Sequence, residues 1–339
     1  GVQTCALPIC VFYALAFKKL LLYNARALSN RAKKLYNTMT RQRTLKNQVH
    51  STGIGLHSGK KVHLTLRPAP ENTGIVFRRV DMANSPHIAV CPTCVGDTRL
   101  STTLMKDGAT ISTIEHLMSA FSGLGVDNAF VDLDAAEIPI MDGSASTFVF
   151  MLKSAGLIEQ GAAKRYIRIT QPIEVKDGDK VATLTPYDGF KLSFEIDFEH
   201  PAFSDEHQVQ DINFSSLRFE KEVSRARTFG FIRDVEALRM QGLALGASLD
   251  NAVGLDEFRV LNEDGLRFKD EFVRHKILDA VGDLYLLGSP ILGAYHGYKS
   301  GHDLNNQLTR KVLATESAWE YVTFDENETA PISFVPLTA

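Results

Sequence analysis

Cysteine is scarce in this sequence, with four residues among 339. So few thiols in a chain of this length exclude a disulfide framework. Two of them, Cys91 and Cys94, form the motif CPTC, which could supply half of a zinc ribbon. Because no second cysteine pair completes such a site, we expect a reduced loop pair in a cytoplasmic protein.

Long hydrophobic runs are also lacking. The uncharged apolar run CALPICVFYALAF, residues 5–17, is too short to span a bilayer comfortably. It also lacks the preceding positive region of a secretory signal. We therefore expect no stable membrane insertion. We also expect translation to start at Met39, which leaves residues 1–38 as an extension outside the fold; the alternative is a weak membrane anchor.

Positive charge is in deficit over most of the chain. The formal net charge is −3, but residues 1–38 carry six basic and no acidic side chains, so residues 39–339 carry −9. This acidic body argues against nucleic-acid binding. What is present is a globular composition, 44% hydrophobic and 23% charged, and a length that predicts about two domains.

Each half of the chain places strand patterns before helix patterns. Short segments with alternating apolar residues predict strands, and longer periodic segments that end near glycine predict helices. The sequence therefore predicts a two-domain α+β protein with a junction near residues 161–165. The predicted strands are 62–68, 74–80, 128–134, 166–170, 172–177, 180–187 and 190–198, and the predicted helices are 112–125, 144–156, 234–245, 271–288 and 306–320.

A weak internal repeat relates the two halves. His116 and His275 are each followed by a glycine seven residues later. A Gly–polar pair that opens a helix follows the first histidine by 27 residues and the second by 26. The repeat predicts that the two histidines occupy equivalent places in two similar domains.

The segment EFVRHKILDAVGD (271–283) places His275, Asp279 and Asp283 four residues apart, and so on one face of a helix. Two ligands at this spacing can reach one zinc ion, and catalytic zinc usually has three protein ligands. His116 could be the third. The alternative is a solvated His–Asp pair, and Asp283 could bind metal, orient an imidazole or be solvated.

Glu115 directly precedes His116 and has two interpretations. Neighbouring residues on a helix are about 100° apart, so one of the two would bind a metal and the other would act beside it. Alternatively, Ser112 and Glu115 form a capping box at the start of the helix.

Three further features could carry chemistry. His302 follows Gly301 in YKSGHDLNN and is suited to general acid catalysis, or it is a turn residue before a helix. Thr228 in SRARTFGF could donate its hydroxyl to an oxyanion, or face solvent. The apolar stretch 229–245 could line a slot for an aliphatic chain, or pack as an ordinary helix.

Six motifs occur in one order: GIGLHSGKKVHLTLRPAPENTGIVFRR, STIEHL, EIPIMDGSA, SRARTFGF, LNEDGLRFKDEFVRHKILDAVGDL and YKSGHDLNN. In this order the sequence closely resembles the family of UDP-3-O-acyl-N-acetylglucosamine deacetylases, the zinc amidases of lipid A biosynthesis. The resemblance covers roughly residues 41–325. It departs from the family in the loop at about 84–98 that carries CPTC.

The resemblance implies a fold of two similar α+β domains, each a β-sheet with a helical layer, with the helices packed between two outer sheets. Domain I would span 39–163 and domain II 164–325, with an acyl-passage insert near 224–260 and a C-terminal tail at 326–339. A cytoplasmic monomer of a Gram-negative bacterium is expected.

The implied reaction is zinc-dependent hydrolysis of the N-acetyl group of UDP-3-O-[(3R)-3-hydroxyacyl]-N-acetylglucosamine, the committed step of lipid A biosynthesis. The alternatives are a zinc amidase for another N-acetyl sugar and a nucleotide-sugar-binding protein without metal. The implied residues are His116, His275 and Asp279 as zinc ligands; Glu115 as base; His302 as acid, oriented by Asp283; Thr228 as oxyanion donor; Lys276 in contact with the substrate near the metal; His57 close to the substrate sugar; Asp197 and Phe198 on the uracil; Lys299 on the diphosphate; and Phe229 in the acyl passage.

Overall fold

The computed structural model describes residues 40–203, 208–325 and 327–337. Residues 41–323 and 331–337 belong to one compact unit, and the other described residues belong to a second unit. The predicted extension 1–38 lies outside the described residues. Among the described residues, no helix has both the length and the apolar character needed to cross a bilayer.

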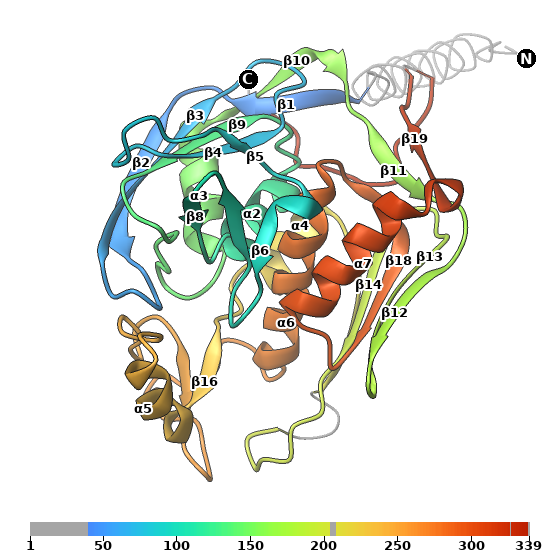
Figure 1. The fold of residues 1–339 in the computed structure, drawn as a ribbon. Coiled ribbons are helices and arrows are strands. Elements are labelled where there is room, and N and C mark those ends of the chain that lie inside the picture. Colours follow the sequence, from blue (N-terminus) through green and yellow to red (C-terminus); the bar gives the residue numbers. More distant parts are fainter. Residues whose placement is uncertain (1–39, 204–207, 326, 338–339) are drawn as a thin grey trace, which may run out of the picture. The chain divides into compact units, whose positions relative to one another are not determined.

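The first large sheet has five strands in the order β2-β3-β9-β4-β5 (Figure 1). Its strand β3 alternates strictly, with Val62, Leu64 and Leu66 fully buried and the residues between them more exposed, so one face of the sheet packs on the core. The sheet is mixed, because β4 and β9 run parallel. Its strands are β2 (Val49–Ile54), β3 (Lys61–Pro68), β4 (Ile75–Arg79), β5 (Ile88–Ala89) and β9 (Ala129–Leu133).

The second large sheet has seven strands, all from residues 166–322. Its longest strand, β18, pairs with β11, β13 and β14. Each large sheet thus comes from one half of the chain, while the division between residues 163 and 164 stays a prediction. The strands are β11 (Tyr166–Ile169), β12 (Ile173–Asp177), β13 (Lys180–Thr185), β14 (Phe190–Glu195), β15 (Val209–Asn213), β18 (Ile291–Tyr298) and β19 (Trp319–Val322).

The main helices lie between the two large sheets, as the resemblance implies (Figure 1). Helices α2 and α6 pack closely, because a Cβ added at Gly282 would meet the Glu115 carbonyl oxygen at 2.0 Å. The small residue lets the two helix backbones approach and brings the start of α2 beside the last turn of α6. The helices are α2 (Glu115–Leu124), α3 (Ser146–Ala155), α6 (Glu271–Leu284, followed by the 3₁₀ turn Tyr285–Leu287) and α7 (His302–Ala314).

Smaller elements complete the unit. The segment predicted as an insert, near 224–260, contains β16, α5 and β17, and its helix α5 has no buried residue. The predicted helix 306–320 is wrong at both ends, because α7 begins at His302 and β19 already starts at Trp319. The remaining elements are β1 (Arg41–Leu45), β6 (Val95–Asp97), β7 (Thr103–Lys106), β8 (Ala109–Ile111), β10 (Leu157–Ala163), α4 (Ser216–Arg218), β16 (Phe229–Phe231), α5 (Ile232–Met240) and β17 (Val253–Leu255), with 3₁₀ turns at Pro92–Cys94 and Glu316–Ala318 and a π-helical turn at Phe219–Val223.

Candidate active site

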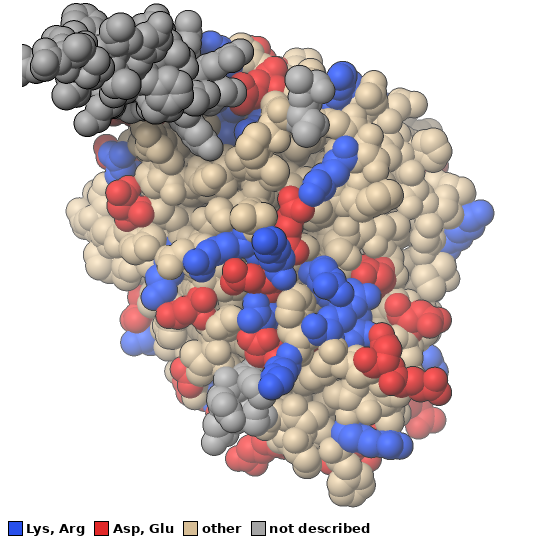
Figure 2. All heavy atoms as spheres, turned by 180° about the vertical axis from the view of Figure 1, so that it is seen from behind, with Lys and Arg blue, Asp and Glu red and all other residues tan. Residues whose placement is uncertain are grey.

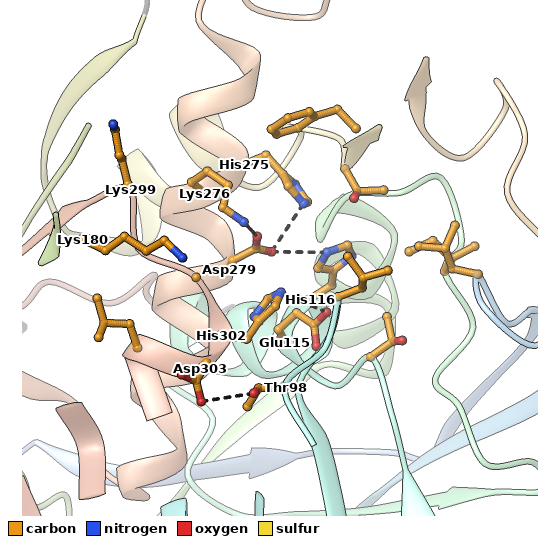
Figure 3. Close-up of a pocket in the computed structure, with 18 of the residues that line it drawn as sticks. Thr98, Glu115, His116, Lys180, His275, Lys276, Asp279, Lys299, His302 and Asp303 are labelled. Atoms are coloured by element: carbon orange, nitrogen blue, oxygen red, sulfur yellow. Dashed lines mark hydrogen bonds and ion pairs between the residues drawn. The ribbon is translucent and has the colours of Figure 1, made fainter. Parts of the chain in front are cut away.

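Two neighbouring helices bring together three side chains of types that bind metals in proteins (Figure 3). His116 stands in the first turn of α2, and His275 and Asp279 lie one turn apart on α6. One ligand atom from each residue lies within 4.8 Å of the others. All three side chains are buried, so the alternative of a solvated His–Asp pair on a helix surface is wrong.

The chemistry of this cluster fits a divalent metal ion. Asp279 Oδ1 is buried and accepts no hydrogen bond from any described residue, although the Nε2 atoms of His116 and His275 lie 3.6 and 3.4 Å from it. The other carboxylate oxygen, Oδ2, accepts a hydrogen bond from Lys276 Nζ at 2.7 Å. A buried oxygen without a hydrogen-bond partner is costly, and a shared cation would satisfy Oδ1 and both imidazoles.

Protonation favours the same interpretation. The Nδ1–H of His275 donates to the Ala226 carbonyl at 3.1 Å, which leaves the Nε2 lone pair directed at the cluster. Burial lowers the pKa of His275 to about 3, so the ring is neutral near pH 7. Burial alone would raise the pKa of Asp279, but His275 and Lys276 hold it well below its usual value. Neutral imidazole and ionised carboxylate are the forms that bind metal.

Glu115 is the first residue of α2, and its carboxylate faces the same cluster. Its Oε2 accepts a hydrogen bond from the Thr102 backbone at 3.0 Å, and Oε1 lies 3.9 Å from His302 Nε2. The capping-box alternative is wrong, because α2 has no side-chain cap and the Ser112 hydroxyl donates to the Ala136 carbonyl instead. Burial raises the pKa of the Glu115 carboxyl, as suits a general base.

His302 begins α7, and its imidazole lies beside Glu115 (Figure 3). Its Nδ1 lies 2.9 Å from Asp283 Oδ2, and Asp283 also accepts hydrogen bonds from the Thr102 hydroxyl and the Asn305 amide. Burial opposes charge on His302, but Asp283 and Glu115 outweigh it and raise the pKa of the imidazole to about 9. The site thus contains a protonated imidazole next to a buried carboxylate.

A pocket of about 410 Å³ is lined by Glu115, His302 and the cluster of His116, His275 and Asp279. Thr228, Lys276, Phe198, Phe229 and Lys299 also line it, and Lys276 contacts Asp279 of the cluster. The predicted residues Asp283, Asp197 and His57 do not line this pocket. Asp283 lies behind His302, Asp197 forms a 2.6 Å ion pair with Lys299, and His57 lines a second cavity.

The second cavity is about 430 Å³ in volume and is largely apolar. Most of its wall comes from β16, α5, β17 and the chain that connects them, which is the predicted insert, and Leu56, His57 and Leu100 complete it. The two cavities share four wall residues, namely Leu56, Leu100, Thr228 and Phe229. An elongated ligand with a polar and an apolar end would fit this pair of cavities.

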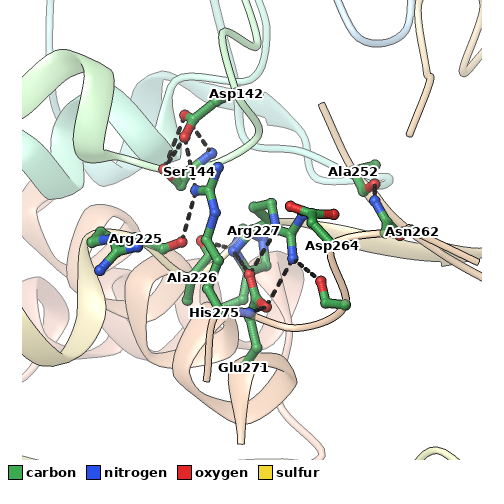
Figure 4. A network of polar contacts seen from close by, with 12 residues as sticks. Asp142, Ser144, Arg225, Ala226, Arg227, Ala252, Asn262, Asp264, Glu271 and His275 are labelled. Carbon is green, nitrogen blue, oxygen red and sulfur yellow. Dashed lines mark hydrogen bonds and ion pairs between the residues drawn. The ribbon is translucent and has the colours of Figure 1, made fainter. Parts of the chain in front are cut away.

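A buried ionic network that we did not predict holds the start of α6 (Figure 4). Glu271, which is fully buried, accepts hydrogen bonds from the Arg227 guanidinium at 2.9 Å and from the backbone N–H groups of Arg227 and Arg267. Arg227 follows Ala226, whose carbonyl orients His275. Arg227 and Glu271 both lie within the motifs that carry the family resemblance. Their pairing depends on a tertiary contact, and neither motif contains a signal for it.

The sequence matches known proteins over most of its length. A family model described as UDP-3-O-acyl N-acetylglycosamine deacetylase matches residues 42–314. The UDP-3-O-acyl-N-acetylglucosamine deacetylase of Marinobacter nauticus is 61% identical over 297 residues, which are 88% of this chain and 98% of that protein. The protein with the same name from Thioalkalivibrio sulfidiphilus is 60% identical over 303 residues, which are 89% of this chain and 100% of that protein. The similarity therefore spans both halves that contribute to the site.

Proposed function

Because the chain belongs to the UDP-3-O-acyl N-acetylglycosamine deacetylase family, we propose that its pocket hydrolyses the N-acetyl group of UDP-3-O-[(3R)-3-hydroxyacyl]-N-acetylglucosamine. The products are acetate and the free 2-amino sugar, in the committed step of lipid A biosynthesis. One observation carries this proposal for the site: a metal-binding cluster, a buried carboxylate and a protonated imidazole share one pocket beside an apolar cavity.

His116, His275 and Asp279 would hold one zinc ion. Zinc bound in such a site supplies Lewis-acid chemistry, lowering the pKa of water to near 7 and polarising a carbonyl oxygen. Lys276 neutralises the second oxygen of Asp279 and so fixes the rotation of that carboxylate. Because Lys276 also lines the pocket, it would contact the substrate near the metal.

Glu115 would take the proton from the attacking water molecule. Its Oε2 is fixed by the Thr102 N–H, whereas Oε1 lies 3.9 Å from His302 Nε2 and would accept that proton. His302 would give its proton to the departing nitrogen, with Asp283 holding the Nδ1 side so that Nε2 points toward Glu115. The Thr228 side chain lines the same pocket, where its hydroxyl would donate to the oxyanion.

The rest of the substrate would extend from this centre in two directions. Phe198 would stack on the uracil, and Asp197 would form a hydrogen bond with the uracil. The ammonium of Lys299 would contact the diphosphate. His57 would lie near the sugar and Phe229 in the acyl passage, where the apolar cavity supports the proposal. We further propose a cytoplasmic monomer, on the family resemblance alone.

The acyl chain gives the decisive test of substrate. Wild-type protein should release acetate from the 3-O-acylated UDP-sugar with a kcat/KM more than about 100-fold above that for UDP-N-acetylglucosamine. Burying only four CH₂ groups, at about 0.8 kcal/mol each, provides this preference. Equal rates would favour an amidase for another N-acetyl sugar.

Two tryptophan substitutions, each at an alanine, test the acyl passage. Ala247 lines the apolar cavity, whereas Ala237 lies exposed on α5 and outside the cavity wall. Ala247→Trp should lower kcat/KM for the acylated substrate only, and Ala237→Trp should leave both substrates unaffected. Equal losses in the two variants would argue against the passage.

A further inference from the structure

A tight turn at the start of β6 brings two thiols into contact. Cys91 precedes the 3₁₀ turn Pro92–Cys94 and Cys94 is its last residue, and the Cys94 N–H donates to the Cys91 carbonyl at 3.0 Å. The two Sγ atoms lie 2.7 Å apart. A disulfide bond is about 2.0 Å long, so the sulfurs need to move closer by only about 0.7 Å to form one.

The two thiols differ in reactivity. Both side chains are half-buried, so small solutes can reach them. Burial alone would raise the pKa of Cys91, but hydrogen bonds from Cys94 and Thr93 lower it below its usual value. Burial and the neighbouring Cys91 raise the pKa of Cys94 to about 11. Cys91 is therefore the thiol that ionises first and attacks.

We propose that Cys91 and Cys94 form a reversible intramolecular disulfide by exchange with a small-molecule disulfide such as oxidised glutathione. The Cys91 thiolate attacks one sulfur of the oxidant, forms a mixed disulfide and releases one glutathione thiolate. The Cys94 thiolate then attacks the Cys91 sulfur and releases the second. Two electrons pass to the oxidant, and the two thiol protons are taken up by the two glutathione thiolates.

Helix α7 already fixes the turn, so disulfide formation requires little further ordering of the backbone. The Pro92 carbonyl accepts a hydrogen bond from the Asn306 amide at 3.0 Å, and the Val95 carbonyl accepts one from Arg310 at 2.8 Å. Both donors stand on α7, the helix that begins at His302. Such a turn favours the internal disulfide over cross-links between molecules.

A zinc site at this turn is less well supported than a disulfide. Among the residues that the structure describes, the single group of three or more potential ligands is that of His116, and neither thiol belongs to it. A structural zinc site needs four ligands, and the turn supplies two. The pair is therefore equipped for thiol exchange.

The experiment uses the full chain with Cys5→Ser and Cys10→Ser, so that only the proposed pair can react. The protein is equilibrated in glutathione buffers of rising oxidised fraction, acid-quenched, alkylated and digested with trypsin. The peptide Val80–Arg99 should change from two alkylated cysteines to none, with loss of two hydrogen atoms, and dithiothreitol should restore it. With Cys94→Ser added, the reaction should stop at a glutathione adduct on Cys91.

Three results would overturn the proposal. In the first, the peptide keeps both thiols at every buffer ratio. In the second, the peptide accumulates glutathione adducts although both cysteines are present. In the third, the disulfide forms only between molecules. The assay needs no substrate, so its outcome is independent of the deacetylase proposal.

Discussion

Glu271 is the residue whose loss should damage this protein most clearly outside the pocket. Its carboxylate is fully buried and faces the Arg227 guanidinium, which is only 3% exposed. Glu271→Gln keeps the shape of the side chain but removes its charge. The guanidinium would then keep the Gly265 carbonyl at 2.7 Å and the exposed Asp264 at 3.7 Å as partners.

The expected cost follows from burial. Removing one partner of a buried ion pair costs about 3–5 kcal/mol, because the remaining charge stays desolvated. The two remaining contacts of Arg227 offset part of this, so we expect a loss near 3 kcal/mol in the free energy of unfolding. Metal affinity should fall by about 10–100-fold as well, since the same network positions the Ala226 carbonyl that orients His275.

Urea unfolding of wild type and variant measures the first effect, with a chelator present so that metal binding does not contribute. Glu320→Gln is the matched control: Glu320 pairs with Arg168 at 3.2 Å, but the two side chains are 53% and 44% exposed. It should lose less than about 1 kcal/mol. Equal losses in the two variants would refute the reasoning from burial.

Three further predictions concern the pocket. Glu115→Gln should lower kcat by about 10²–10⁴-fold while zinc stays bound, because a general base is removed; near-normal turnover with full metal content would exclude that role. Turnover should fall as pH rises through about 9, where His302 loses its proton. A pH–rate profile with the same alkaline limb in His302→Gln would contradict this assignment. A chelator should lower the Tm of wild type but not of His116→Ala, because only the native cluster gains stability from the ion; calorimetry that shows equal shifts would count against the cluster.

Periodicity predicted much of the secondary structure. The strand predicted at 62–68 is confirmed as β3, and the helix predicted at 271–288 is confirmed as α6 with its following 3₁₀ turn. Boundaries were less accurate where local signals misled. The predicted helix 112–125 begins only at Glu115. The expected capping residue Ser112 does not cap it, because its hydroxyl donates to the Ala136 carbonyl instead.

Spacing along one helix indicated that His275 and Asp279 share a face, but it could not reveal what lies opposite. That arrangement depends on Gly282, where the missing side chain lets α2 approach α6. The same limit applies to Thr102, whose N–H holds Glu115 and whose hydroxyl holds Asp283. Contacts between distant segments follow from packing, which neither periodicity nor motif spacing describes.

Metal content tests the central claim most directly. After dialysis against metal-free buffer, wild-type protein and the control His296→Ala, an exposed histidine on β18, should each retain one zinc ion per chain by elemental analysis. His116→Ala should retain far less, because it removes one of three ligands. Wild-type protein without stoichiometric zinc, or a His116→Ala variant that retains it, would contradict the proposed site.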